Sequence, residues 1–503
     1  MKLQSTNKTW NTFGEFLLPV VIALIFLVFT FAYFPFREKL QFDTDEGLNL
    51  MRSMLVASGH SLYSEISSDQ PPLFTQMLAL LFRVTGFEVN PARSLVLLFS
   101  TLLVCSGAQF LQLTWGKLAA ILFLPLMIMV PRYLVLSTAV MIGVPSIALA
   151  SVSMLFVILW HQKKSSMWLM LSAFTLALSV LIKLFTGFFA PIFLIGITAS
   201  VYFEGRANGF SWKMLRPALI WSVCFAGLAL LLGLVLVGPR NIWLIIFPHL
   251  TAPSIENLQG ANYTINAHLQ PAIPLLFLGL LGALISIYRR NWLSLYLLAW
   301  AAMAYALFSF YSPVFYHHQL LITIPMAMLA AAGVGDALLT LIRIRQPSDL
   351  IRFQAFVGAA SLIGFILAAH QYLPALDKQL MDVPRIRGLS LRATPGKLKV
   401  IRIMNEYIDK TNWIMTDMPM YAFRVHRPVP PSIATFSSKR LATGSLTEED
   451  ILTAMREYRP EQVLMARFEI PALEAYLQEN YTLVLSVEFF RLFIRNDLNL
   501  ATK

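Results

Sequence analysis

The chain carries the apolar string FLLPVVIALIFLVFTFAYFPF at residues 16–36 and, five residues later, the acidic string FDTDEG at residues 42–47. The first string is long enough to cross a bilayer, which takes ~20 apolar residues. The second places the carboxylates of Asp43, Asp45 and Glu46 within four residues, directly beyond that span. We therefore predict that the acidic string lies at the boundary between lipid and water.

The residues after the acidic string have helical periodicity. One side carries apolar residues at i, i+3 and i+7, and the other carries polar residues: Leu48, Met51 and Leu55 against Asp45, Asn49 and Arg52. This pattern predicts a short amphipathic helix that lies in the membrane interface with its acidic N-terminal end in water. A carboxylate in that position can act on a lipid-borne substrate.

A purely structural role is the alternative for two of the three carboxylates. Asp43, followed three residues later by Glu46, has the spacing of a capping box, and helix N-termini favour negative charge in general. Capping accounts for Asp43 and Glu46 but leaves Asp45 without a structural task. Asp45 is therefore the strongest candidate for chemistry.

Composition identifies a polytopic membrane protein. Of 503 residues, 57% are hydrophobic and 13% are charged, and the mean hydropathy is +0.65, which excludes a soluble globular protein of this size. Cys105 and Cys224 both lie in apolar runs, so a disulfide framework and a cysteine metal cluster are excluded. The net charge of +12 suits contact with anionic lipid, and no nucleic-acid-binding motif is present.

Hydropathy predicts about eleven membrane spans. They cover residues 16–36, 93–113, 118–135, 140–160, 166–182, 186–203, 216–238, 272–288, 292–310, 315–335 and 353–373. The segment 37–91 is too polar for a plain span and is placed outside the membrane, with two interfacial helices. The second of these follows Asp69-Gln70-Pro71-Pro72, where the proline pair suits a helix start.

Basic residues predict the orientation of the spans. Lys2 and Lys8 precede the first span, which lacks a cleavage site and is predicted to be an uncleaved signal anchor. The loops with Lys163-Lys164, Arg206 to Arg216, Arg289-Arg290 and Arg343 to Arg345 alternate onto the same side, which the positive-inside rule places in the cytoplasm. The acidic string, the loop 239–271 and everything after residue 374 are then predicted to be extracytoplasmic.

Two domains are predicted, a transmembrane module at 1–375 and a soluble extracytoplasmic domain at 376–503. The second contains alternating helices (397–410, 447–458, 471–480) and strands (413–416, 463–466, 482–487, 489–495), which predicts a small α/β fold. It has no glycine-rich phosphate loop and no nucleophile elbow. Neither domain shows internal repeats, which disfavours an inverted-repeat transporter.

Further charged and polar residues are predicted at the outer ends of different spans. They are Arg132, Lys183, His317 and His318. Lys183 has the alternative of snorkelling to the interface, and the histidines that of ordinary interfacial polarity. Together with the carboxylates, however, they form the set that a lipid-linked phosphate substrate requires: cations for the phosphate and a carboxylate to activate an acceptor. A phosphate leaves without protonation near neutral pH, so one base is sufficient.

Three motifs in the first loop carry a family resemblance. They are Asp43-Thr44-Asp45-Glu46-Gly47, Gly59-His60-Ser61-Leu62-Tyr63 and Asp69-Gln70-Pro71-Pro72-Leu73. They resemble the first-loop pattern of GT-C glycosyltransferases, in particular the branch with protein O-mannosyltransferases and the lipid A aminoarabinose transferase. The Leu-Ile-Lys183 stretch and Tyr316-His317-His318-Gln319-Leu320-Leu321 are similar to bacterial members of that branch. The resemblance covers residues 1–375, while the C-terminal domain matches no motif.

The resemblance implies an enzyme in the plasma membrane of a bacterium, acting on the extracytoplasmic face. It implies transfer of a monosaccharide from a polyprenyl-phosphate donor to an extracytoplasmic acceptor (protein, lipid or cell-envelope glycan). The essential acid falls on Asp45, with Glu46 beside it, and inversion is expected if Asp45 is a base. The implied substrate-binding residues are Asp43, Tyr63, Asp69, Gln70, Arg132, Lys183, His317 and His318. Some relatives bind a divalent metal ion, for which this sequence assigns no ligands.

Two alternatives remain open from the sequence. A transporter or flippase of lipid-linked sugars would use the same cationic cavity without needing Asp45 as a base. A membrane-anchored scaffold or receptor would place its function in the C-terminal domain and leave the first loop dispensable. The acidic first loop favours the enzyme over both.

Overall fold

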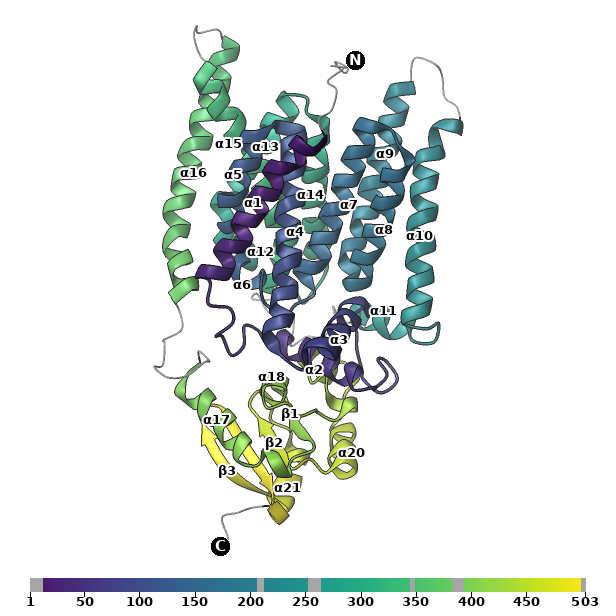
Figure 1. The fold of residues 1–503 in the computed structure, drawn as a ribbon, viewed down its shortest axis with the longest axis vertical. Helices are drawn as coiled ribbons and strands as arrows, with labels where there is room; N and C mark the ends of the chain where they lie inside the picture. Colours follow the sequence, from purple (N-terminus) through teal and green to yellow (C-terminus); the bar gives the residue numbers. More distant parts are fainter. Residues whose placement is uncertain (1–11, 206–211, 252–263, 344–348, 382–392, 499–503) are drawn as a thin grey trace.

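The computed structural model of the chain describes residues 12–205, 212–251, 264–343, 349–381 and 393–498. A bundle of long apolar helices forms one end of the molecule, and a small unit containing a β-sheet forms the other (Figure 1). The predicted helical membrane fold with a C-terminal α/β unit is confirmed. The exact division at residues 375 and 376 stays a prediction.

Each of the eleven predicted spans overlaps an apolar helix of the described chain. These helices are α1 (Thr12–Tyr33), α4 (Val89–Trp115), α5 (Lys117–Ile128), α7 (Gly143–Lys163), α8 (Ser166–Ile182), α9 (Phe189–Gly205), α10 (Arg216–Leu236), α13 (Ile273–Tyr288), α14 (Leu295–Phe310), α15 (Leu320–Arg343) and α16 (Asp349–Met381). Nine spans in the described residues are long and apolar enough to cross a membrane, whereas α5 and α8 have only 12 and 17 residues.

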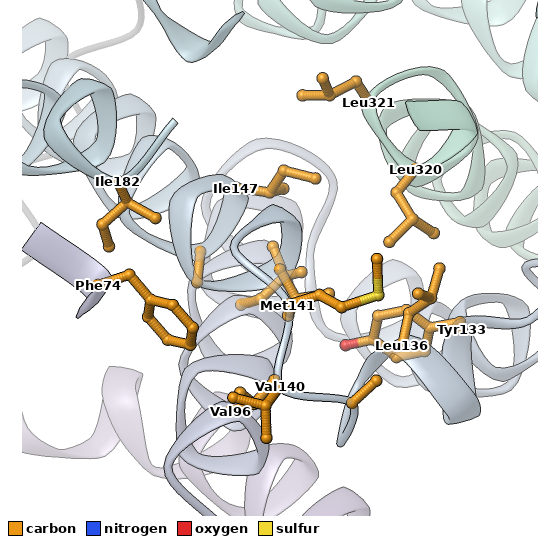
Figure 2. Packing of buried hydrophobic residues seen from close by; sticks show 14 of the residues in the cluster. Phe74, Val96, Tyr133, Leu136, Val140, Met141, Ile147, Ile182, Leu320 and Leu321 are labelled. Atoms are coloured by element: carbon orange, nitrogen blue, oxygen red, sulfur yellow. The ribbon is translucent and has the colours of Figure 1, made fainter. Parts of the chain in front are cut away.

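One predicted span is wrong in its extent. The segment 118–135 is not a single helix, because α5 ends at Ile128 and a four-residue helix, α6 (Tyr133–Leu136), follows. Between them Pro131 is followed by Arg132, whose φ of 59° is left-handed and cannot continue a helix. The break turns the chain back toward the bundle, where Tyr133, Leu136 and Met141 pack close to Leu320 of α15 (Figure 2).

Close helix packing in the bundle depends on glycine at one crossing. A Cβ atom on Gly282 of α13 would lie 1.9 Å from the carbonyl oxygen of Leu329 in α15. Without a side chain at this point, the two backbones approach closely, as small residues allow in membrane helices. α15 is consequently buried along almost its whole length.

The first loop contains the two predicted short helices, α2 (Thr44–Ala57) and α3 (Leu73–Thr85). α2 is not the surface-lying amphipathic helix that was predicted, because all of its residues from Glu46 to Val56 are buried within the protein; its depth at the membrane interface stays a prediction. α3 covers part of α2, and α18 (Pro419–Arg424) of the C-terminal unit, a helix that hydropathy did not reveal, covers another part. A Cβ atom on Gly47 would lie 2.7 Å from the backbone nitrogen of Met420, so α18 packs directly on the α2 backbone.

The C-terminal unit has a four-stranded sheet in the order β1-β2-β4-β3. The strands are β1 (Ile414–Thr416), β2 (Gln462–Met465), β3 (Tyr481–Val487) and β4 (Phe490–Arg495), of which only β1 and β2 pair in parallel. Its principal helices are α17 (Pro395–Glu406), α19 (Ser438–Ala442), α20 (Glu448–Tyr458) and α21 (Pro471–Asn480). The predicted start of α20 is confirmed by a capping box between Thr447 and Asp450.

The C-terminal unit docks on the first loop through backbone and charge contacts. Arg424 of α18 donates hydrogen bonds to the carbonyl oxygens of Lys39 and Leu40, at 2.9 and 3.0 Å. The hydroxyl of Thr435 donates to the carbonyl of Ser67 at 2.7 Å. These contacts fix the unit against the end of the bundle that carries α2 and α3 (Figure 1).

Candidate active site

A cavity of about 490 Å³ lies where the helix bundle, the first loop and the C-terminal unit meet. Of the residues singled out in the sequence, those that line it are Asp43, Asp45, Asp69, Gln70, Lys183, His317 and His318. Glu46, Tyr63 and Arg132 are not among its lining residues. α7 runs from Gly143 at this cavity to Lys163, about 30 Å away at 1.5 Å per residue. The predicted separation of Asp45 from Lys163 therefore holds, while the compartment that the cavity faces stays a prediction.

Asp45 is held at the N-terminal turn of α2 by its neighbour Asp43. The Oδ1 of Asp43 accepts a hydrogen bond from the backbone N–H of Asp45 at 2.9 Å, so Asp43 is the N-cap. The Oδ2 of Asp43 accepts from the hydroxyl of Tyr316 at 2.9 Å, which ties the cap to the segment before α15. The predicted capping role of Asp43 is confirmed, and it leaves the Asp45 carboxylate unused by the cap.

The Asp45 carboxylate is open to the cavity, but protein surrounds the cavity on most sides. The resulting desolvation, with the nearby charges of Asp43 and Asp69, raises the pKa of Asp45 from 3.8 to about 6. The positive charges of Arg52 and Lys183 act in the opposite direction without cancelling this rise. A carboxylate with a pKa in this range is ionised at neutral pH and is more basic than an ordinary aspartate.

Lys183 supplies a cation on the membrane side of the cavity. It ends α8 and precedes a short 3₁₀ helix, η1 (Leu184–Phe188), and only 6% of its surface is accessible. Its ammonium lies 5.7 Å from the centre of the Phe185 ring and makes no ion pair or hydrogen bond within the described part of the chain. A buried ammonium that makes no hydrogen bond or ion pair in the described residues is a natural binding point for an anionic ligand.

Arg52 is a cavity residue that the sequence analysis did not select as a candidate. It lies two turns after Asp45 on the same side of α2, where helical spacing had already placed it. Its guanidinium donates to the hydroxyl of Ser68 at 2.8 Å and to the side-chain oxygen of Asn49, while its buried Nε has no partner in the described residues. The signal that could have identified it was the shared polar face.

Glu46 forms a buried ion pair instead of facing the cavity. Its two carboxylate oxygens each accept from Arg93 of α4 at 2.8 Å, and both side chains are 0% exposed. They also accept from the backbone N–H groups of Phe42, at 2.9 Å, and Val140, at 3.3 Å. The sequence prediction paired Glu46 with Asp45 in catalysis, but these contacts give Glu46 the task of joining the first loop to the bundle.

Of the remaining first-loop candidates, some line the cavity and one is buried next to the lining residues. Tyr63 is buried behind the lining, and its hydroxyl donates to the carbonyl of Gln70 at 2.8 Å. Asp69 lies in the lining, where its Oδ2 accepts from the ammonium of Lys439 at 2.9 Å and its Oδ1 from the amide of Gln70 at 3.1 Å. Tyr63 therefore shapes the loop that presents Asp69 and Gln70.

The candidates from the other spans likewise lie at two depths. His317 and His318 both line the cavity, with ring centres 4.4 Å apart, and the Nδ1 of His318 accepts from the backbone N–H of Phe315 at 3.0 Å. Arg132 is exposed and does not line the cavity, and its guanidinium lies 4.5 Å from the centre of the Tyr316 ring. Because Tyr316 bonds Asp43, Arg132 contacts the site through this ring.

The C-terminal unit lines one side of the cavity, which no sequence motif indicated. Its contribution consists of Thr435, Ser437, Ser438, Lys439 and Arg467. Lys439 reaches Asp69 of the first loop across 370 residues of chain. The unit is thus part of the site.

The described residues contain no group of three or more His, Cys, Asp or Glu side chains arranged to hold a metal ion. The implied metal therefore has no ligand set in this part of the chain, and no step below depends on one.

The fold of the whole chain is similar to that of known membrane protein structures. No family model and no curated protein match the chain. The structure of ArnT from Cupriavidus metallidurans in the apo state is similar with a TM-score of 0.60 at 14% identity, over 96% of this chain and 98% of that one. The same ArnT bound to undecaprenyl phosphate gives a TM-score of 0.58 over the same shares. The apo oligosaccharyltransferase of Archaeoglobus fulgidus gives 0.54 at 13% identity, over 91% of this chain and 70% of that one. The predicted GT-C fold is confirmed by these likenesses.

Proposed function

We propose that this membrane protein is a glycosyltransferase that moves a monosaccharide from a polyprenyl-phosphate donor to an acceptor hydroxyl. The observation that carries the proposal is the convergence of Asp45 and Lys183 on one cavity at the end of the bundle. A carboxylate with a raised pKa and a buried ammonium that makes no ion pair within the described residues are suited to act as the base and the phosphate ligand of this transfer. ArnT, which shares the fold, has been captured with undecaprenyl phosphate.

The residues suggest a direct displacement. The acceptor oxygen attacks the anomeric carbon, its proton passes to the Asp45 carboxylate, and the bond from the anomeric carbon to the phosphate oxygen breaks. The phosphate takes the bonding electron pair and leaves as polyprenyl phosphate, with its negative charge held by Lys183. Attack opposite to the leaving group inverts the anomeric centre, because no enzyme nucleophile intervenes.

Other residues of the site set the position of the base. Asp43 caps the helix that carries Asp45, and Tyr316 fixes Asp43. Glu46 acts as a positioning residue, since its ion pair with Arg93 anchors the same turn of α2 to α4. Small errors in the placement of a base are costly, which gives these contacts a function beyond stability.

We place the cavity on the extracytoplasmic face of a bacterial plasma membrane. The support is the basic loops predicted at the opposite end of the spans, together with the position of the cavity near the ends of α7, α8 and α15. The acceptor is then a protein, lipid or envelope glycan on that face.

The proposed transfer is tested with membranes that contain the protein and membranes that lack it. Both are incubated with a radiolabelled polyprenyl-phosphate sugar, and the label in products other than the donor is counted. A transporter would move the donor but leave the label on it.

Replacing Lys183 by alanine should weaken binding of the polyprenyl-phosphate donor more than it changes use of the acceptor. The ammonium is the membrane-side charge for the phosphate, and hydrogen bonds to charged groups contribute about 1.5–3 kcal/mol. Lys183→Arg should restore part of the affinity, because it keeps the charge but changes the geometry. Donor affinity measured on purified protein in detergent decides the matter; an alanine variant with wild-type affinity would reduce Lys183 to a snorkelling side chain.

The rate of transfer should fall as the pH drops through about 6. The base must be ionised, and the pKa of Asp45 is raised to about 6 by desolvation within the cavity and by its acidic neighbours. Since this pKa is higher in the folded than in the unfolded chain, protonation of Asp45 itself favours the folded state, and the loss is therefore not unfolding at this group. A pH series of kcat/KM, with the fold followed by circular dichroism, tests this. A rate that stays constant from pH 7.5 to 5 would contradict it.

A further inference from the structure

A turn at the edge of the C-terminal sheet presents Arg467 to the cavity. Asp417 follows β1, and Ala466, Arg467 and Phe468 follow β2; because β1 and β2 are parallel, both ends lie at the same sheet edge. The buried Asp417 carboxylate accepts hydrogen bonds from the backbone N–H groups of all three residues, at 3.0, 2.6 and 3.0 Å. One carboxylate thereby fixes the backbone of the whole turn.

The side chains of the turn are fixed as well. The guanidinium of Arg467 lies 4.8 Å from the centre of the Phe468 ring, and this ring stacks on Phe436 with 5.4 Å between the ring centres. Arg467 is exposed, lines the cavity, and makes no side-chain hydrogen bond or ion pair within the residues that the structure describes. Its backbone and ring contacts therefore hold a guanidinium whose N–H groups remain available.

Two of the other cations of the cavity differ from Arg467, because their charged groups are bonded to other side chains. Lys439 is paired with Asp69, and Arg52 is bonded to Ser68 and Asn49. Lys183, which makes no such bond to any residue that the structure describes, belongs to the bundle side, whereas Arg467 belongs to the C-terminal side. The cavity thus has an available cation on each of these two sides.

We propose that Arg467 binds an oxyanion of a substrate from the C-terminal side of the cavity, and that Asp417 is the positioning residue that holds the Arg467 turn. A guanidinium held in this way can contact a phosphate or carboxylate through two parallel N–H groups. The oxyanion is either the phosphate of the donor or an anionic group of the acceptor. The inference rests on the proposed function, since it assigns a further contact in the same site.

The test compares Arg467→Gln with wild type in two measurements. One is binding of undecaprenyl phosphate to the full-length protein in detergent. The other is the dependence of labelled-sugar transfer on the concentration of isolated cell envelopes, which supply the acceptor. Loss of a hydrogen bond to a charged group should weaken one of the two by about 10- to 100-fold. A weaker undecaprenyl phosphate complex assigns Arg467 to the donor, and a raised KM for envelopes with unchanged lipid binding assigns it to the acceptor.

Controls separate this inference from the proposed function. Arg456→Gln removes an exposed arginine of the same unit, which is paired with Glu449, and should change neither measurement. Arg467→Lys should recover part of the loss. If Arg467→Gln binds and transfers as wild type does, the inference is overturned while the transferase remains. If wild type transfers no sugar at all, the proposed function fails instead.

The role of Asp417 is tested by a double-mutant cycle. Asp417→Asn places an amide where the turn N–H groups need an acceptor. It should therefore raise the same constant that Arg467→Gln raises, which is either the dissociation constant for undecaprenyl phosphate or the KM for envelopes. The double variant should be no worse in that constant than Arg467→Gln alone, because both changes remove one contact. Independent, multiplying effects would contradict the positioning role of Asp417, because they would mean that it does not act through Arg467. Should Asp417→Asn fail to fold, Phe468→Leu removes the ring under Arg467 while leaving the turn backbone in place; it should raise the same constant, and wild-type binding by Phe468→Leu would contradict the positioning claim.

Discussion

Replacing Asp45 by asparagine is expected to lower the rate of sugar transfer by about 10²–10⁴-fold, the usual cost of losing a general base. Asparagine keeps the size of the side chain and its hydrogen-bonding capacity, but it cannot take the acceptor proton. Donor binding and membrane insertion should stay unchanged, because neither depends on a base. The measurement is transfer of radiolabelled sugar from polyprenyl phosphate in membranes, with the protein level checked alongside.

Asp43→Asn is the matched control for this change. Asparagine caps a helix about as well as aspartate, so the α2 cap should survive, although one side-chain oxygen replaces the two that bond Asp45 and Tyr316. Its effect on transfer should be far smaller than that of Asp45→Asn. Equal rates for Asp45→Asn and wild type would rule out Asp45 as the base, and equal losses in both variants would point to a disturbed loop.

Replacing Arg93 by alanine is expected to destabilise the protein by about 3–5 kcal/mol, the cost of leaving a buried charge without its partner. Glu46 is 0% exposed, and no other side chain in the described residues donates to it. The same change removes the hydrogen bonds from Arg93 to the carbonyl oxygens of Phe36 and Lys39, both at 2.6 Å. Equilibrium unfolding in detergent measures the loss.

Two further variants show whether the buried pair is the cause. Arg93→Met combined with Glu46→Gln removes both charges and should recover part of the stability that Arg93→Ala loses. Arg402→Ala breaks an exposed pair with Glu406 in α17 and should leave the unfolding transition in place. An Arg93→Ala protein as stable as the Arg402→Ala protein would exclude the anchoring role of the ion pair.

The sequence predicted the membrane side of the site because charge in an apolar helix is costly. Lys183 and the histidines stood out at the ends of spans, and alternating loop charge placed those ends on the side of Asp45. Side chains at the same end of a helix bundle are close together in space and can therefore line one cavity. The spacing of seven residues between Asp45 and Arg52 also indicated that both side chains lie on one side of the helix, and it could have identified Arg52 as a site residue.

The sequence could not reveal partners that are distant along the chain. Glu46 fits a capping box locally, and nothing in that pattern points to Arg93, 47 residues away. The burial of α2 was missed in part for the same reason, since one of the helices that cover it, α18, is a six-residue helix near the other end of the chain. Hydropathy also predicted one span over 118–135, because it does not detect the break in the helix at Pro131 and Arg132.

The contact between the first loop and the C-terminal unit can form only late in synthesis, because the two segments lie far apart in the sequence. Thr435 and Lys439 complete the cavity by reaching Ser67 and Asp69, which leave the ribosome 368 and 370 residues earlier. At a synthesis rate of ~5–20 residues per second, the first loop waits roughly 20–70 s for these partners. Once Lys183 has also been made, Asp45 and Lys183 border a cavity that still lacks the side lined by Thr435 and Lys439. A chain arrested before the C-terminal unit is made would contain Asp45 and Lys183 but not the complete lining of the cavity.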